Sequence, residues 1–153
     1  MIPKLMIRVA ELDDISLMEA IAEAAYGPYV ERMGCRPAPM DADFVAHVSR
    51  HEAYVVQDKH GIGGFVVTYP KLDGQFVENV AVAAERRGTG LGRKLCNFTE
   101  IEARRRKLPK VYLYTNVKMT ENLTYYKRLG YAETNRVTED GFDRVYMEKQ
   151  LTS

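Results

Sequence analysis

The stretch VENVAVAAERRGTGLGRKL, residues 77–95, connects an apolar strand pattern to a predicted helix through alternating glycines at positions 88, 90 and 92. Four cations surround these glycines: Arg86, Arg87, Arg93 and Lys94. Cations are unfavourable at a helix N-terminus, where the helix dipole is already positive. The glycines leave the N–H groups of the first helical turn open to a ligand. We therefore predict that this loop binds a polyanion such as a pyrophosphate.

The patterns on either side of this stretch alternate between strands and helices. Apolar runs predict strands near residues 5–10, 52–58, 62–70, 75–83, 111–116, 131–137 and 144–149. Helical spacing predicts helices from Asp13 or Asp14 to Ala25, with a kink or restart at Gly27-Pro28, near 42–49, from Leu91 through Ile101 and near 120–129. We expect one α/β domain covering residues 1–153. Its mixed central sheet has about seven strands, parallel in the middle and antiparallel at both ends, and is flanked by about four helices.

The composition fits a soluble globular protein. The 153 residues are 46% hydrophobic and 28% charged, and the net charge is +1. This balance gives no global attraction to nucleic acid or to a membrane, and no apolar run approaches the roughly 18 residues of a membrane span. Residues 1–10 contain too short an apolar run for a secretory signal, and Cys35 and Cys96 match no paired metal or redox spacing. We expect a cytoplasmic protein with two free thiols.

Two common phosphate-binding loops are excluded by their defining residues. A Walker loop ends in Gly-Lys-Ser/Thr, whereas Gly92 is followed by Arg-Lys-Leu. The dinucleotide fingerprint needs a third glycine three positions after the second, where this chain has Arg93. The remaining pattern is Arg-x-x-Gly-x-Gly, formed by Arg87, Gly90 and Gly92. The alternative is a glycine-rich turn whose arginines are merely solvated.

Directly after a strand containing NVAV, this pattern resembles the acyl-CoA loop of the GNAT acetyltransferase family. The later family motif, Tyr-x-x-x-Gly-aromatic, matches residues 126–131, YKRLGY, and the order of elements agrees across nearly the whole chain. The resemblance implies acetyl-CoA as a co-substrate, no metal and no covalent enzyme intermediate. The cofactor-binding residues that it implies are Val80, Ala81, Val82, Arg87, Gly88, Thr89, Gly90, Leu91, Gly92, Arg93, Asn116, Asn122 and Tyr126.

The resemblance also implies a cleft where the strands near 75–83 and 110–116 splay apart. Backbone N–H groups near Val80 and Val82 would bind the pantetheine arm and polarise the thioester carbonyl. Asn116 could orient a water or a CoA amide, or it could be a turn residue. Asn122 could contact the cofactor or cap a local turn.

Two residues are candidates for proton transfer. Tyr126 matches the family's general acid, which protonates the leaving CoA thiolate; the alternative is that it only packs beside leucines of its own helix. Glu78 is the candidate base, because we place it on the same strand face as Val80 and Val82, where burial could raise its pKa. A cross-strand ion pair is the alternative for Glu78, and a water chain could replace it as the base.

The acceptor side gives weaker signals. In this fold the first helix pair and the loop after it usually wall the acceptor pocket: Tyr26, Tyr29, Glu31, Arg32 and the loop through Met40. Glu31 could attract a cationic amine and Arg32 a carboxylate, although each could be plain helix surface. His47 and His51 could share a helix face, but no third ligand is evident, so we expect no metal site.

We therefore expect an N-acetyltransferase that moves an acetyl group from acetyl-CoA to a primary amine of a small molecule by direct attack. One alternative acceptor is the N-terminus or a lysine of a protein. The alternative from another class is a CoA-binding sensor that has the fold but no turnover. By analogy with the family a homodimer is expected, although no residue of the sequence demonstrates it.

Overall fold

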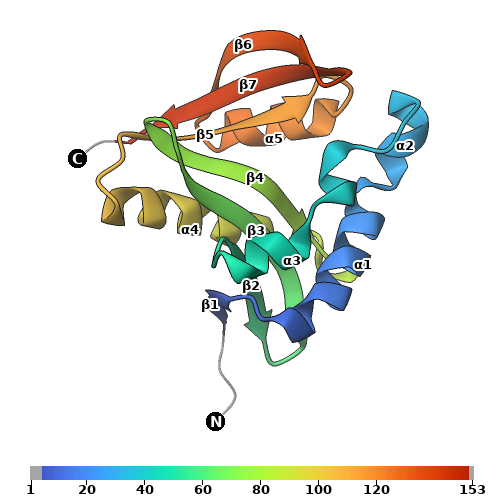
Figure 1. Cartoon of the computed structure of the whole chain (residues 1–153), viewed down its shortest axis with the longest axis vertical. Coiled ribbons are helices and arrows are strands. Elements are labelled where there is room, and N and C mark those ends of the chain that lie inside the picture. The colour runs from blue at the N-terminus through green and yellow to red at the C-terminus, as the bar shows by residue number, and fades with distance from the viewer. Residues whose placement is uncertain (1–4, 152–153) are drawn as a thin grey trace.

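Seven strands form one open sheet in the order β1–β2–β3–β4–β5–β7–β6 (Figure 1). The structure is a computed structural model that describes residues 5–151. The strands are β1 (Met6–Val9), β2 (Ala53–Asp58), β3 (Gly61–Lys71), β4 (Gly74–Val82), β5 (Lys110–Asn116), β6 (Ala132–Glu139) and β7 (Phe142–Gln150). β4 and β5 pair in parallel, whereas the other described neighbours are antiparallel. The predicted mixed α/β sheet is confirmed.

Helices cover both faces of the sheet. They are α1 (Ile15–Tyr26), α2 (Pro28–Met33), α3 (Phe44–Ser49), α4 (Leu91–Arg105) and α5 (Thr120–Arg128). The kink or restart predicted at Gly27-Pro28 is a restart, because Pro28 begins the separate helix α2 directly after α1, as proline can at a first helical position. Within residues 5–151, no helix combines the length and the apolarity that a membrane crossing requires.

Two buried clusters lie on opposite faces. One joins α1 and α3 to the first half of the sheet around Met18, Phe44 and Phe65. The other joins α4 and α5 to the opposite face of the sheet, from β2 to β7, around Leu95 and Met147. Figure 1 shows α3 in front of the sheet and α4 behind it. Each face is therefore closed by its own pair of helices, and the centre of the sheet is left to hold a site.

β4 and β5 diverge halfway along their length. Residues 75–77 pair with residues 111–113, and among the described residues the ladder between the two strands ends there. β4 nevertheless continues to Val82 and β5 to Asn116. Where β4 and β5 no longer pair with each other, the backbone N–H and C=O groups on their facing edges need other hydrogen-bond partners. The V-shaped opening is where the sheet can accept an extended ligand.

β4 also contains a bulge at Glu78. Two consecutive residues of β3 pair with Val77 and Asn79, which leaves Glu78 without a partner across the strand pair. One extra residue reverses the alternation of side chains beyond it. Val80 and Val82 consequently pack against the cluster beneath α4 and α5, whereas Glu78 contacts α3 on the opposite face. The prediction that Glu78 shares a face with Val80 and Val82 is wrong.

Candidate active site

A cleft of about 810 Å³ lies between the end of β4, the glycine loop, the start of α4 and one side of α5. Its volume falls in the usual range for sites that bind small molecules and cofactors. The residues that line it are Ala25, Tyr26, Tyr29, Val80, Ala81, Val82, Arg86, Arg87, Gly88, Gly90, Leu91, Gly92, Arg93, Cys96, Glu121, Asn122, Thr124, Tyr125, Tyr126 and Arg128. Eleven of the predicted cofactor-binding residues are in this set; Thr89 and Asn116 are not.

The glycine loop leaves the first turn of α4 without side-chain caps. Gly88 and Gly90 adopt φ values of +77° and +86°, a conformation that side chains disfavour. Gly90 is the N-cap of α4 and provides no side-chain hydrogen bond, and the N–H of Lys94 donates to its carbonyl at 3.1 Å. The N–H groups of residues 91–93 come before the first intrahelical bond and are orphan donors. This geometry is typical of an anion site.

The cations of the loop divide into two kinds. Arg87 and Arg93 line the cleft and are exposed, and they form no ion pair within residues 5–151. Arg86 instead forms an ion pair with Asp58 at the end of β2, so its charge is already compensated. Arg128, which no sequence pattern indicated, brings a further cation from the end of α5. The cationic side of the cleft is therefore made by residues from two helices and the loop.

Gly92 serves packing as well as ligand access. A Cβ atom at this position would lie 2.9 Å from the hydroxyl oxygen of Tyr125. Tyr125 also lines the cleft, and its burial raises its pKa to about 12. Tyr125 was not among the predicted site residues, because the family motif begins one residue later.

Tyr126 lies where the large cleft meets a smaller cavity, and it lines both. The side chain is buried, and this burial raises the pKa of its phenol well above the ordinary value. The hydroxyl therefore stays protonated at neutral pH and can donate a proton. Its ring packs edge to face against Tyr125 and Tyr131, with centroids 5.5 Å apart in each pair. Both the catalytic and the packing interpretations of Tyr126 are compatible with this position.

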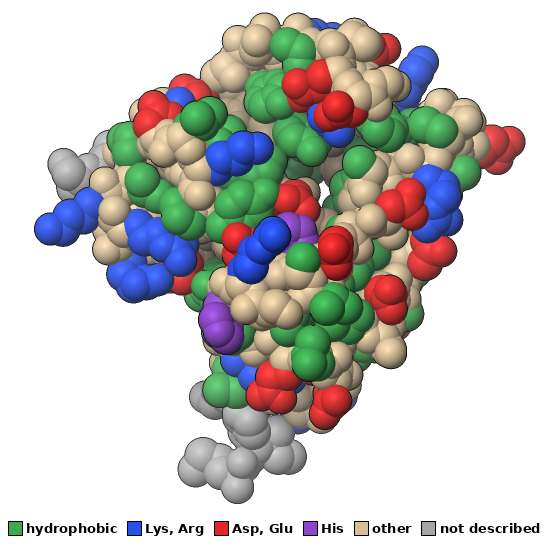
Figure 2. Space-filling model, in the orientation of Figure 1, with side chains coloured by type: hydrophobic (Ala, Val, Ile, Leu, Met, Phe, Trp, Pro, Cys, Tyr) green, Lys and Arg blue, Asp and Glu red, His purple; other side chains and the backbone are tan. Residues whose placement is uncertain are grey.

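The smaller cavity has a volume of about 50 Å³ and lies between β4, β5, the start of β7 and the loop at residues 37–39. Tyr26, Val80, Asn122 and Tyr126 line both cavities. The two cavities therefore adjoin along the splayed strands. Figure 2 shows the surface hollowed between the β6–β7 end of the sheet and α2, with acidic and histidine side chains beside the hollow.

Glu78 lines the smaller cavity and belongs to a half-buried hydrogen-bonded chain. Its carboxylate lies 2.7 Å from Nε2 of His47 and accepts a hydrogen bond of 2.5 Å from the hydroxyl of Tyr69. Nδ1 of the same histidine lies 2.9 Å from Glu52. His47 thus connects two carboxylates, a role that its sequence context did not indicate.

The expected rise in the pKa of Glu78 is also wrong. Burial does raise this pKa, but the hydrogen bonds from His47 and Tyr69 lower it by more, so it lies below its ordinary value. The hydrogen bond to Glu78 likewise raises the pKa of His47. Glu78 is therefore a stable carboxylate at neutral pH, and its ion pair is with a helix residue rather than across the sheet.

The two asparagines make different contacts. Oδ1 of Asn116 accepts a hydrogen bond of 2.9 Å from the N–H of Lys118, as a turn residue does, while the residue also lines the smaller cavity. Nδ2 of Asn122 lies 3.5 Å from Oγ1 of Thr115. Thr89 donates its hydroxyl hydrogen bond to the carbonyl of Arg86, which turns its side chain into the loop.

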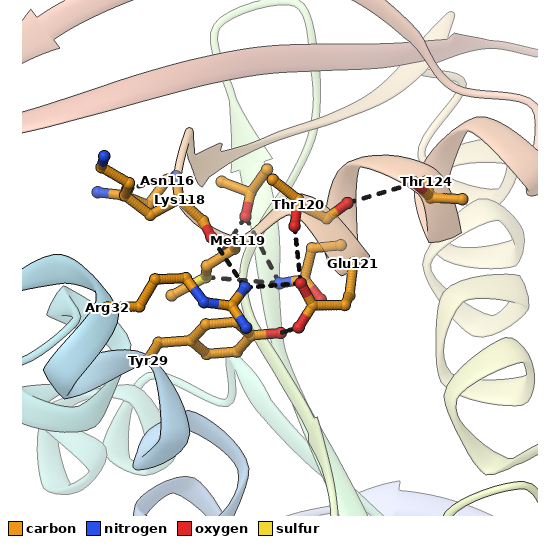
Figure 3. A network of polar contacts seen from close by, with 10 residues as sticks. Tyr29, Arg32, Asn116, Lys118, Met119, Thr120, Glu121 and Thr124 are labelled. Atoms are coloured by element: carbon orange, nitrogen blue, oxygen red, sulfur yellow. Dashed lines mark hydrogen bonds and ion pairs between the residues drawn. The ribbon is translucent and has the colours of Figure 1, made fainter.

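A polar network joins α2 to the start of α5 (Figure 3). Arg32 forms an ion pair of 2.6 Å with Glu121 and donates to the carbonyl of Lys118 at 3.1 Å. The hydroxyl of Tyr29 donates to the other carboxylate oxygen of Glu121 at 3.3 Å. Arg32 is therefore already paired. Glu31, the other charge expected at the acceptor wall, does not line either cavity.

Tyr26 of the predicted acceptor wall has a defined role. Its hydroxyl lies 2.9 Å from both Oδ1 of Asn79 and the carbonyl of Val80. These contacts fix α1 against β4 beside the bulge.

Within residues 5–151, no three His, Cys, Asp or Glu side chains gather as a metal ion would require.

Comparison with known proteins identifies the domain type. A family model described as an acetyltransferase (GNAT) domain matches residues 49–133, more than half of the chain. This range contains the glycine loop, strands β4 and β5, and the tyrosine motif at the end of α5. A comparison with curated protein sequences finds no match.

Several solved structures are similar. The ribosomal-protein-S18-alanine N-acetyltransferase from Escherichia coli has a TM-score of 0.74 at 19% identity over 97% of this chain and 95% of that one. The PaiA N-acetyltransferase from Thermoplasma acidophilum, in complex with coenzyme A, has a TM-score of 0.78 at 13% identity over 97% and 99%. Nourseothricin acetyltransferase is 27% identical with a TM-score of 0.59, over 64% of each chain.

Proposed function

The chain belongs to the GNAT acetyltransferase family, and we propose that it transfers an acetyl group from acetyl-CoA to the primary amine of a small molecule. The observation that carries this proposal is the position of Tyr126, which lines both the large cationic cleft and the small polar cavity. One cavity suits the cofactor, the other suits the acceptor, and a protonated phenol stands between them. The amine attacks the thioester directly with both substrates bound.

The large cleft fits the phosphate end of acetyl-CoA. The orphan N–H groups of residues 91–93 hold the pyrophosphate, and Arg87 and Arg93 neutralise its charge. The end of β4, which pairs with β3 but no longer with β5, binds the pantetheine arm through the backbone of Val80, Ala81 and Val82 on its open edge. Bound acetyl-CoA supplies the acetyl thioester at the point where the two cavities meet.

The residues around the junction manage charge and protons. Backbone N–H groups of β4 near Val80 and Val82 stabilise the negative charge that develops on the thioester oxygen. Glu78 attracts the ammonium group of the acceptor and accepts one proton from it, which frees the lone pair that attacks the thioester carbon. The nitrogen loses its second proton as the C–N bond forms, and this proton replaces the one that Tyr126 gives to the sulfur. Tyr126 donates its proton to the sulfur as the C–S bond breaks. The proton-transfer roles of Glu78 and Tyr126 stay predictions.

The cofactor site is tested by calorimetric titration with CoA and acetyl-CoA. Gly90→Glu should abolish binding, because it adds a carboxylate facing the phosphates and strains a residue at positive φ. Gly34→Glu is the matched control, since Gly34 has φ +76° and, like Gly90, open space where a Cβ atom would lie, but is outside the large cleft. Loss of binding in both variants, or in neither, would contradict the assignment of the loop.

Turnover is tested by thiol release with a panel of amines. We expect the wild type to release CoA thiol with at least one small amine, and Tyr126→Phe to lower turnover while leaving CoA affinity nearly intact. A sensor would bind CoA and release no thiol with any acceptor, and a protein acetyltransferase would require a peptide. The expected homodimer and the cytoplasmic location stay predictions.

A further inference from the structure

We propose that the acceptor is a small amine that also carries a carboxylate, with Glu78 binding the ammonium group and Arg144 binding the carboxylate. This inference rests on the proposed function and specifies its substrate class. Arg144 lies near the start of β7, and no sequence pattern indicated a role for it. β5 lies between β4 and β7 in the sheet, and Glu78 of β4 and Arg144 of β7 both line the smaller cavity.

The charge pattern of the smaller cavity is the first observation. Among the described residues that line it, Glu78 and Arg144 are the only charged ones. The others are apolar, aromatic or neutral polar side chains. A volume of about 50 Å³ holds few atoms, because a single water needs roughly 10–15 Å³ on this measure. The cavity therefore fits a small dipolar head group whose remainder extends toward the open cleft.

The environment of Arg144 is the second observation. Its side chain is only 8% exposed, and its guanidinium stacks on Tyr114 at 4.2 Å and on Phe142 at 5.3 Å. Both of its ion pairs, with Glu139 at 3.2 Å and Asp140 at 3.1 Å, use the same nitrogen, Nη1. Within the described chain, Nη2 and Nε donate no hydrogen bond. A buried guanidinium with donors to spare is suited to the two oxygens of a carboxylate.

The two ion-pair partners of Arg144 do not fill the cavity. Asp140 and Glu139 are 81% and 38% exposed at the side chain, and neither lines the cavity. The pair with Asp140, whose carboxylate is mostly exposed, contributes little and reorganises easily. Both partners use Nη1, and Arg144 itself lines the cavity, so Nη2 and Nε are the donors that we propose for a ligand.

Tyr114 connects the two charged residues electrostatically. Burial raises the pKa of the Tyr114 hydroxyl, the positive charge of Arg144 lowers it, and the negative charge of Glu78 raises it. Both charges therefore act on the same aromatic side chain from the cavity walls. An acceptor in the smaller cavity therefore meets both the carboxylate of Glu78 and the guanidinium of Arg144, which line it together with Tyr114.

Other acceptor classes fit these charges less well. A diamine would place its second ammonium near Arg144, where like charges repel. An amine without a carboxylate would gain no charge-assisted hydrogen bond from Arg144, so it would bind less tightly than an amino acid. A molecule with both an ammonium and a carboxylate satisfies both walls.

The test compares matched acceptors by kcat/KM. The panel holds α-, β- and γ-amino acids, the primary amide and the decarboxylated amine of each, a linear diamine and a short peptide. We expect the wild type to prefer an amino acid over its amide roughly 10- to 100-fold, the effect of one charge-assisted interaction. An equal or greater rate with the amides, the diamine or the peptide would overturn the inference and leave the proposed acetyl transfer intact.

Variants of Arg144 test whether this residue causes the preference for the acid over the amide. Arg144→Gln should abolish the preference for the acid over the amide, mainly through KM for the acid, while kcat/KM for the amide stays nearly constant; Arg144→Lys should retain part of it. Arg105→Gln is the matched control, because Arg105 is exposed at the far end of α4. An unchanged acid-to-amide ratio in a folded Arg144→Gln protein would overturn the assignment. Absence of thiol release with every acceptor would instead overturn the proposed function itself.

Discussion

The two ends of α4 carry similar numbers of arginines in opposite circumstances. At the C-terminal end, Arg105 pairs with Glu102 at 2.7 Å and Arg106 donates to Gln75 at 3.0 Å. Cations there also suit the negative end of the helix dipole. At the N-terminal end, Arg87 and Arg93 line a cleft without ion pairs in the described chain and oppose the dipole. Folding alone therefore explains the arginines at the C-terminal end of α4 but not those at its N-terminal end.

The largest effect should come from removing the cations of one end at a time. Arg87→Ala combined with Arg93→Ala should weaken CoA binding roughly 100-fold, because two charge-assisted interactions with the phosphates are lost. Arg104→Ala combined with Arg105→Ala removes the same number of charges from the other end and should leave the affinity unchanged. Calorimetry at low ionic strength measures both. Equal losses in the two double variants would indicate a general charge effect and erase the contrast.

A smaller effect should separate packing from ligand binding at the N-terminal end. Gly92→Ala should lower the free energy of unfolding by about 1 kcal/mol, because the new Cβ atom crowds the hydroxyl of Tyr125. Denaturant unfolding measures this loss. Adding Tyr125→Phe should restore most of the stability, since it removes the crowded oxygen. Failure of this rescue would mean that Gly92 is required by the backbone rather than by Tyr125.

The smallest effect concerns the protein without ligand. Arg93→Ala should raise the free energy of unfolding by about 0.3–1 kcal/mol, because it removes a cation from the positive end of the dipole. Arg105→Ala should lower the free energy of unfolding, because it breaks the pair with Glu102. Urea unfolding of both variants without CoA provides the measurement. A loss of stability in Arg93→Ala would show that this arginine serves the fold.

The pH dependence sharpens the same contrast. The hydrogen bond from Arg105 lowers the pKa of Glu102 below its ordinary value of 4.5. A group whose pKa is lower in the folded state stabilises the fold above its unfolded pKa, and this contribution is lost as the pH falls through the folded pKa. The stability difference between wild type and Arg105→Ala should therefore vanish in acid. The Arg93→Ala difference should persist, since it depends on no carboxylate of that pair.

Local patterns were enough to predict most of the fold and the cofactor cleft. The apolar runs and the glycine loop are continuous in the sequence, so their strands and the start of α4 could be read directly. The turn at Asp140-Gly141 was predictable for the same reason, and both residues adopt the positive φ values that such hairpin turns require.

The acceptor side could not be predicted because its geometry depends on distant residues. The direction of Glu78 depends on its pairing with β3, and a bulge leaves no mark in the alternation of a strand that is buried on both faces. The contact with His47 joins positions on different elements. Arg144 reaches the cavity because β7 inserts between β5 and β6, an order that no single segment reveals.

The bulge in β4 has a consequence for engineering and for descent. Before Glu78, the side chains of β4 alternate between the two faces of the sheet in one order. After Glu78 the order is reversed, so the bulge decides which of the two buried clusters each later side chain joins. Grafting Glu78 alone onto a regular strand would send its carboxylate to the layer beneath α4. The inserted residue and its side chain must therefore be transplanted, or inherited, as a single unit.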